Sequence, residues 1–342
     1  MVKKQPKPSL VAPSPSWTLD DGISFSLLSR FLNCRERFRL YAVKGTREVS
    51  HSKANMDWGT YFHKLLELRA KHPHKRPDQL FRLNKVILPP DDLDVAQLVY
   101  ELYHEFYSAD TYQYFATEDV FDVKYQIPGS HAFRLRGRLD ETILEPDRTL
   151  RIQENKTKEY IDEANLEATI PFNLQTMFYA VAANIHYKKP ITGVLYNVIR
   201  KPKHRQTAKD KTRAAFLARL RSEIEKDANR FFYRWKYDIF PDQMNTWKNY
   251  TLHPMLLQLK VWWDSVKHDP FSPWTTPEDY REGPNGKPLP QNLVINPHHC
   301  MRPFGVYDSL TTGTGDFFDL ITRNNPVGTT EGNIPFRELI DE

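Results

Sequence analysis

Residues 136–157 read RGRLDETILEPDRTLRIQENKT, and this stretch decides the fold. It holds most of two runs rich in β-branched and apolar residues, 133–144 and 150–156, with a Pro-Asp turn between them. A similar run, 120–127, lies ahead of them and ends in a Pro-Gly turn. Short runs of this composition between turn residues predict β-strands, so we expect three consecutive strands here.

The sequence on either side of these strands predicts helices and one further strand. Apolar residues recur at helical spacing in three earlier segments, 24–43, 57–68 and 95–107. After the strands we expect a helix, an apolar strand and a long charged helix, at 171–187, 191–199 and about 211–237. This order predicts an α/β fold with a central mixed β-sheet flanked by helices and an added N-terminal helical region.

The chain has 342 residues, of which 40% are hydrophobic, enough for one large domain or two modest ones. We expect a single domain at 21–312, between a disordered lead at 1–20 and a loosely attached tail at 313–342. Within this domain we expect a helical N-terminal part, a central core and a closing part, at 21–118, 119–240 and 241–312.

Several protein classes are excluded by composition. No apolar run approaches the roughly 18–20 residues that cross a bilayer, so we expect no membrane association. The Lys- and Pro-rich residues 1–15 have no apolar core and do not form a secretory signal. The two cysteines do not make a disulfide scaffold, which indicates a reduced, cytoplasmic setting. The formal net charge is only +5, so basic residues matter only where they cluster.

Acidic residues and a lysine occupy the predicted strands. Side chains alternate along a strand, so Ile152, Glu154 and Lys156 project from the same face. Charged groups beside apolar neighbours are costly to bury without compensation. A divalent metal shared by Asp140 and Glu154 would compensate, because Mg²⁺ and Mn²⁺ prefer carboxylate oxygens. Lys156 could then orient the attacking water or stabilise charge on a phosphate.

This spacing alone does not decide the function. Asp122-Val123-Lys124 also fits the pattern of an acidic residue, any residue and a lysine, and it too lies in a predicted strand. Either tripeptide could belong to a solvated strand face. The surrounding sequence has to separate them.

Five motifs in order supply that context. They are the segment from Ser24 to Tyr41 with FLNCRERFRLY, Gly59-x-x-x-His63-x-x-Leu66-Glu67, Gly137-x-x-Asp140, Glu154-x-Lys156-Thr157, and Gln175-x-x-x-Tyr179. Together they resemble the RecB-like, CRISPR-associated-exonuclease-like branch of the PD-(D/E)XK nuclease superfamily. The resemblance extends from about residue 22 to residue 310.

The resemblance implies a restriction-endonuclease-like core and a metal-dependent deoxyribonuclease. It makes Asp140 and Glu154 the main metal ligands, with His63 and the Asn155 carbonyl as additional ones. It places Gln175 and Tyr179 against the scissile strand near Lys156. Two alternatives stay open at this point. A histidine on a helix is usually packed or at the surface, and Tyr179 lies among Met177, Phe178 and Val181, which leaves a core role open.

The cysteines depart from this branch. Many members hold an iron–sulfur cluster with one N-terminal and three C-terminal cysteines, and Cys34 and Cys300 match only two of these positions. Four thiolates cannot come from two cysteines, so we expect no cluster. A zinc site with His298 and His299 is conceivable, yet the spacing fits no standard zinc pattern.

A basic segment follows the last predicted strand. We expect its side chains to contact nucleic acid phosphates, which would make binding salt-dependent: Arg200, Lys201, Lys203, Arg205, Lys209 and Lys211. The alternative is a solvated loop. For the aromatic residues between 231 and 237 we favour core packing over base stacking.

The sequence therefore predicts a Mg²⁺- or Mn²⁺-dependent DNA nuclease, more an exonuclease on single strands or duplex ends than a sequence-specific endonuclease. The resemblance implies a role in recombination, repair or phage genome processing, in a host cytoplasm if the protein is viral. No Walker motif is present, so a helicase or recombination partner would be a separate chain. The rivals are a catalytically silent binding protein with the nuclease fold, and an interaction protein that docks through residues 334–340.

Overall fold

The computed structural model describes residues 15–33, 35–43, 45, 54–110 and 112–267. The chain forms two compact units, one of Ser50–Pro254 and one of Met1–Val49 with Met255–Glu342. The larger unit carries every predicted site residue. Cys34, Cys300 and its neighbouring histidines, residues 313–342 and the docking peptide at 334–340 lie outside the described residues. The division into lead, domain and tail therefore stays a prediction.

The larger unit is built on a mixed sheet, as the sequence predicts. Its strands are β2 (Gln113–Gln126), β3 (Ala132–Leu144), β4 (Leu150–Lys158), β5 (Ile191–Arg200) and β6 (Phe232–Asp238). Neighbouring strands pair in this order, β4 with β5 in parallel and the other pairs antiparallel. The three consecutive strands predicted from residues 120–156 are confirmed, because Pro and Gly or Asp turns separate them.

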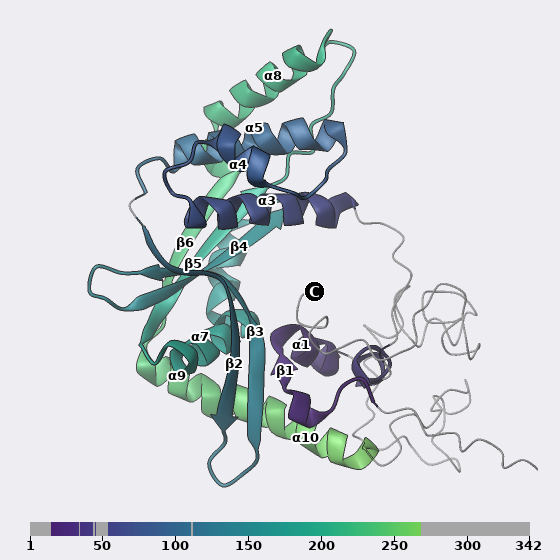
Figure 1. Cartoon of the computed structure of the whole chain (residues 1–342), viewed down its shortest axis with the longest axis vertical. Helices are drawn as coiled ribbons and strands as arrows, with labels where there is room; N and C mark the ends of the chain where they lie inside the picture. Colours follow the sequence, from purple (N-terminus) through teal and green to yellow (C-terminus); the bar gives the residue numbers. More distant parts are fainter. Residues whose placement is uncertain (1–14, 34, 44, 46–53, 111, 268–342) are drawn as a thin grey trace, which may run out of the picture. The chain divides into compact units, whose positions relative to one another are not determined.

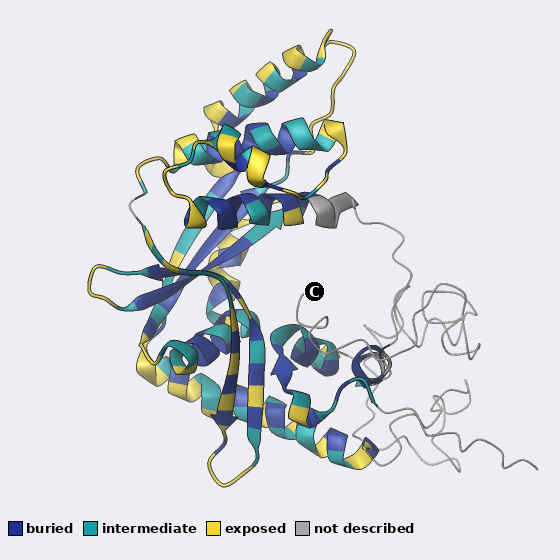
Figure 2. Cartoon of the chain, in the orientation of Figure 1, coloured by how far each residue is buried: buried dark blue, intermediate teal, exposed yellow. Residues whose placement is uncertain are grey.

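Helices cover both faces of this sheet (Figure 1). On one face lie α3 (Ala54–Lys71), α4 (Pro77–Leu83), α5 (Pro90–Phe106) and α8 (Arg213–Lys226). They share one apolar core with Ile199 of β5, while the outward side of α8 is exposed (Figure 2). The other face carries α7 (Leu174–Tyr187), which contacts α9 (Pro241–Trp247).

The crossover from β4 to β5 supplies the helix that covers the site. A parallel strand pair needs a long connection, here α6 (Glu163–Thr169), the 3₁₀ turn η3 (Ile170–Phe172) and α7. The side chain of Asn173 accepts a hydrogen bond from the Thr176 N–H and caps α7. The helix therefore begins three residues after the expected start at 171.

The long charged helix predicted for 211–237 is wrong in its second half. The helix α8 ends at Lys226, the turn η4 (Ala228–Arg230) follows, and 232–238 forms β6. The free edge of β5 offers backbone hydrogen bonds, and a run of aromatic residues fits a strand better than a helix. Phe231 and Phe232 are buried in the core, while the later aromatic residues are half-buried.

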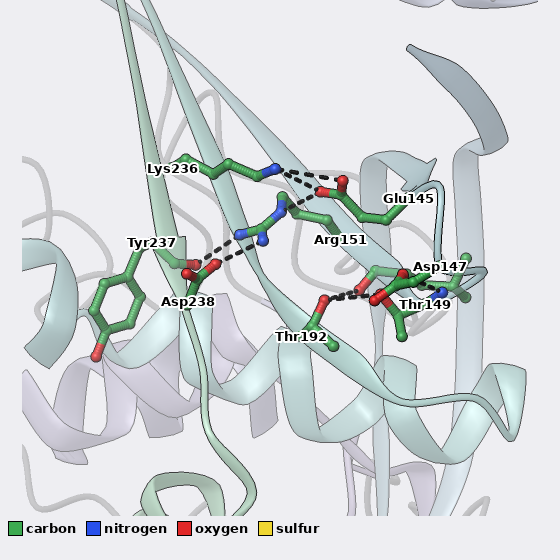
Figure 3. Close-up of polar contacts among 9 residues, drawn as sticks. Glu145, Asp147, Thr149, Arg151, Thr192, Lys236, Tyr237 and Asp238 are labelled. Carbon is green, nitrogen blue, oxygen red and sulfur yellow. Dashed lines mark hydrogen bonds and ion pairs between the residues drawn. The ribbon is translucent and has the colours of Figure 1, made fainter.

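At the start of β4 a buried arginine ties the strands together (Figure 3). Arg151 donates hydrogen bonds to Glu145 Oε1 at 2.6 Å, Asp238 Oδ1 at 2.6 Å and the Tyr237 carbonyl at 3.0 Å. Its side chain is only 7% exposed. A Cβ on Gly193 would lie 2.2 Å from the Arg151 guanidinium, so only glycine leaves room for it. This network holds the sheet at the end opposite Lys156.

The smaller unit is helical and aromatic. Its described elements are η1 (Leu19–Asp21), β1 (Ile23–Ser24), α1 (Phe25–Asn33), α2 (Arg35–Phe38), η2 (Arg39–Val43) and most of α10 (His253–Val266), which follows η5 (Lys248–Leu252) of the larger unit. Trp17, Phe31 and Trp262 all pack edge-on against Phe38, with ring centroids 5.0–5.6 Å apart. In the described parts of both units, no helix is long and apolar enough to cross a membrane.

Candidate active site

The site forms where β3 and β4 separate. Their ladder runs from the Leu144–Leu150 pair to the Glu141–Gln153 pair and stops there. The next residues, Asp140 and Glu154, face each other at this opening. The Asn155 N–H, which has left the ladder, donates a hydrogen bond to Asp140 Oδ2 at 2.8 Å. Strand separation therefore leaves Asp140 partly accessible and frees the Asn155 N–H to hold its carboxylate.

Glu154 and Lys156 project together, as strand alternation predicts. Lys156 Nζ lies 2.5 Å from Glu154 Oε1 and donates a hydrogen bond to Gln175 Oε1 of α7 at 3.2 Å. Burial alone would lower the pKa of Lys156, but the neighbouring Glu154 carboxylate outweighs it and raises the pKa. The lysine is thus fixed and charged between the strand and the helix.

Tyr179 lies one turn after Gln175 on the same side of α7. Burial, reinforced by Glu154, raises its pKa to about 12, so the hydroxyl stays protonated at neutral pH. Its ring packs against Phe121 at 5.8 Å and reaches within 3.5 Å of where a Cβ on Gly137 would stand. Both the functional and the packing interpretation of Tyr179 fit this position. Gly137 is needed because that Cβ would also lie 2.7 Å from the Phe121 ring.

His63 reaches the site from α3, on the face of the sheet opposite to α7. Its Nδ1 lies 3.9 Å from Asp140 Oδ2. The helix α3 comes this close because Gly59 packs against β4, where a Cβ would stand 2.9 Å from Thr157 Oγ1. Burial, with the Lys156 charge adding to it, lowers the pKa of His63 to about 4. The imidazole is therefore neutral at pH 7 and can act as a ligand or hydrogen-bonding group.

Lys156 does not fully offset the negative charge of the two carboxylates. Burial raises the pKa of both Asp140 and Glu154, and the Asp140 charge raises that of Glu154 further, against the opposing effect of Lys156. A divalent cation would relieve this repulsion. Among the described residues, no three His, Cys, Asp or Glu side chains form a ready metal cage. Two carboxylates suffice for Mg²⁺, which keeps several waters and also binds substrate phosphates.

Asn155 points its side chain away from this opening, into a buried polar network. Its Nδ2 donates to Glu141 Oε2, and its Oδ1 accepts from Gln153 at 3.1 Å and from Asn197 at 2.7 Å. Asn197 continues the network to the Tyr103 hydroxyl of α5 at 2.9 Å. Only the Asn155 backbone carbonyl is left for the predicted metal role.

Sequence reasoning missed two acidic residues near Asp140. Glu141 is fully buried, and burial together with the Asp140 charge raises its pKa well above the usual value. Glu118 has a left-handed backbone, φ 50°, and its Oε2 lies 3.0 Å from Arg138 Nε. Burial, with Asp140 adding to it, raises the pKa of Glu118 to about 7. Glu141 adjoins Asp140 in the sequence, whereas no local signal marks Glu118.

The competing tripeptide lies elsewhere on the sheet. Asp122 on β2 forms ion pairs across the hairpin with Arg134 and, at 3.2 Å, with Arg136. Lys124, on the same strand as Asp122, is exposed. Among the described residues it has no equivalent of the contacts of Lys156 with Glu154 and Gln175. Asp122 and Lys124 therefore lie on a solvated strand face, with Val123 turned into the core.

The basic segment begins beside the site and leads away from it. Arg200 is the register partner of Lys158, two residues beyond Lys156. Lys201 Nζ lies 3.9 Å from Asp92, and Lys203 Nζ lies 2.6 Å from Glu159. Three further basic side chains are exposed in the loop that precedes α8: Arg205, Lys209 and Lys211.

The comparison with protein families decides the class. A model described as the PD-(D/E)XK nuclease superfamily matches residues 22–244, well over half of the chain. The chain belongs to the PD-(D/E)XK nuclease superfamily. The mixed sheet flanked by helices agrees with the restriction-endonuclease-like fold of a PD-(D/E)XK nuclease. Membership indicates a nuclease, which hydrolyses phosphodiester bonds of a nucleic acid substrate, and the superfamily typically uses divalent metal ions.

Two further comparisons add no argument. No curated protein matches the chain significantly. A solved structure, recorded as "Crystal structure of SSO0001", matches with 15% sequence identity over 58% of this chain and 84% of that chain. Its TM-score is 0.21, which is too low to support a conclusion about the fold. The branch within the PD-(D/E)XK superfamily stays a prediction.

Proposed function

We propose that the chain is a Mg²⁺- or Mn²⁺-dependent DNA nuclease of the RecB-like branch, acting as an exonuclease on single strands or duplex ends. One observation carries the proposal: Lys156 Nζ is held between Glu154 at 2.5 Å and Gln175 at 3.2 Å, where β3 and β4 open beside Asp140. A binding protein that had lost catalysis would not need a half-buried lysine fixed against a buried carboxylate.

The site residues take distinct roles in this proposal. Asp140 and Glu154 would hold the metal ion, with the neutral His63 imidazole and the Asn155 carbonyl as further ligands. When bound, the ion supplies positive charge to the scissile phosphate and lowers the pKa of a bound water. Lys156 orients the attacking water and stabilises negative charge that develops on the phosphate.

Gln175 and Tyr179 position Lys156 and the scissile strand from α7. The basic segment extends the contact to neighbouring phosphates: Arg200, Lys201, Lys203, Arg205, Lys209 and Lys211. Such contacts would make binding fall steeply with salt. The exonuclease assignment, the choice of DNA, and a role in recombination, repair or phage genome processing with a separate helicase or recombination protein rest on the family resemblance.

Digestion of end-labelled linear DNA and of closed circular DNA, single- and double-stranded, tests the proposal. With Mn²⁺ the wild type should degrade linear DNA and leave circles intact, and EDTA should abolish the reaction. Glu154→Gln should lower the rate at least about 10²-fold, because the variant loses a charge aimed at the metal. Asp122→Asn, which alters the competing tripeptide, should cleave within about twofold of wild type.

Three outcomes would contradict all or part of the proposal. Equal cleavage by wild type and Glu154→Gln would remove the site from the reaction. Metal-independent DNA binding without any cleavage of DNA or RNA would favour the rival, a catalytically silent binding protein. Rapid cutting of circular DNA would overturn the exonuclease assignment alone.

A further inference from the structure

The segment between β4 and α7, residues 159–173, is fixed beside the site by its apolar side chains. Leu166 and Ile170 pack against Tyr196 and Val198 of β5. Val198 is the register partner of Lys156. The Tyr233 hydroxyl of β6 also donates to Glu167 Oε1 at 2.6 Å. The segment is thus an ordered wall next to the catalytic lysine.

Two large aromatic side chains at the ends of this wall are left out of the packing. Tyr160 is 67% exposed and Phe172 is 79% exposed. Tyr160 lies four residues after Lys156, and Phe172 lies three residues before Gln175. An extended chain spans at most about 3.6 Å per residue, so their Cα atoms lie within about 14 Å and 11 Å of these site residues. Lys156 and Gln175 are joined by a hydrogen bond of 3.2 Å, so both rings lie on the stretch of chain that leads from one of these site residues to the other.

A basic pocket adjoins the start of the wall. Its volume is about 690 Å³, and its cationic lining comprises Arg200, Lys203, Lys226 and Arg230. Two carboxylates also line it, Asp227 and Glu223, the latter paired with His204 at 2.7 Å. Arg200 donates to the Glu159 carbonyl at 3.0 Å, next to Tyr160. Among the described residues, Lys226 and Arg230 form no ion pair. These two charges are available to an anionic ligand.

We propose that Tyr160 and Phe172 stack the bases of an unpaired DNA strand whose phosphates enter the basic pocket. In a duplex each base is already stacked and paired with its neighbours, whereas a single strand offers its bases to an exposed ring. Cations that track phosphates beside aromatic rings are the combination that binds single strands without reading their sequence. The inference rests on the proposed function and names the substrate class of the same site: a single strand or an unpaired end.

Binding without cleavage tests this inference. Fluorescence anisotropy in EDTA should compare a labelled oligothymidine with a blunt duplex of equal length, using the full chain. Tyr160→Ala and Phe172→Ala should each weaken single-strand binding by about 5- to 150-fold, the range found for loss of one stacked base. Duplex binding should change by less than about twofold. Tyr160→Phe, which keeps the ring, should bind like wild type.

Matched controls come from two similarly exposed aromatic residues that follow β6 in the chain. Phe240 is 67% exposed and Tyr250 is 80% exposed. Phe240 lies two residues after the last residue of β6, which pairs with Gly193 near the start of β5. Gly193 is five residues before Val198 on that strand, a distance of about 17 Å. Phe240→Ala and Tyr250→Ala should leave single-strand binding unchanged. For the pocket, Lys226→Ala and Arg230→Ala should each reduce the slope of log affinity against log salt by about 0.7.

The failure of this inference is distinct from the failure of the proposed function. Single-strand binding within twofold of wild type in both Tyr160→Ala and Phe172→Ala would overturn the stacking surface, even if the wild type cleaves DNA. Equal losses in the Phe240 control, or equal losses on the duplex, would overturn it as well. The wild type could also lack nuclease activity while Tyr160→Ala and Phe172→Ala selectively lose single-strand binding. That result would support the stacking surface and overturn only the nuclease assignment.

Discussion

Replacement of His63 by glutamine should stabilise the protein in acid relative to wild type. Burial and the Lys156 charge lower the pKa of His63 from about 6.5 to about 4. As pH falls below 6.5, the unfolded chain takes up a proton on this imidazole while the folded chain does not. Proton uptake by the unfolded state alone lowers the free energy of unfolding, so wild type should lose stability between pH 6.5 and pH 4.

The magnitude follows from these two pKa values. At pH 5 the linkage relation gives a loss of about 2 kcal/mol at most, compared with almost none at pH 7. The His63 side chain keeps 31% of its exposure. Solvent screening therefore reduces the effect. Between pH 7 and pH 5 the free energy of unfolding of His63→Gln should rise by roughly 1–2 kcal/mol relative to that of wild type.

Urea unfolding in EDTA at both pH values measures this difference. His72→Gln serves as a control, because His72 is exposed just beyond α3. The opposite result is a specific alternative: if His63 ionised to pair with Asp140, 3.9 Å away, wild type would gain stability in acid relative to the variant. Either that gain or a difference independent of pH would refute the assignment of a neutral imidazole.

Three further substitutions test other parts of the structure by urea unfolding. Arg151→Met should cost about 1–3 kcal/mol, because it removes the three hydrogen bonds of a buried guanidinium and leaves the Tyr237 carbonyl and the half-buried Glu145 without this donor. Lys236→Met, whose side chain is 49% exposed, should cost at most about 1 kcal/mol, and equal losses would contradict the network. Gly59→Ala should cost about 1–3 kcal/mol by overpacking α3 against β4, and Thr157→Ala in the same chain should recover most of that loss, which purely additive effects would not do. Burial raises the pKa of Glu118 to about 7, so its contribution to wild-type stability declines as pH rises from about 4.5 to 7. Over this range the free energy of unfolding of Glu118→Gln should rise by up to about 3 kcal/mol relative to wild type. A difference that does not change with pH would exclude the raised pKa.

Local sequence signals predicted the strands that carry the site. β3 and β4 could be predicted because β-branched and apolar residues, alternating side-chain character and Pro-containing turns coincide over short stretches of sequence. The family resemblance then separated Glu154 and Lys156 from Asp122 and its neighbours, which spacing alone could not do. The roles of the separated residues remain predictions, although the structure brings His63, Asp140 and Gln175 together around them.

Contacts between segments far apart in the chain could not be predicted from the sequence. The segment 232–238 forms a strand because it pairs with the edge of β5, whose residues lie 33–45 positions earlier in the chain. The polar network behind β4 joins Asn155 to Asn197 and then to Tyr103 of α5, which no periodicity reveals. Glu118 approaches Asp140 only because β2 pairs with β3 across the hairpin.

The most direct test of the nuclease assignment compares two lysines in equivalent tripeptides. The rate of Mn²⁺-dependent degradation of linear DNA should fall by about 10²–10³-fold in Lys156→Met, and it should stay within about twofold of wild type in Lys124→Met. Circular dichroism should show that both variants are folded. Comparable rates for the two variants would contradict the assignment of Asp140, Glu154 and Lys156 as the catalytic core.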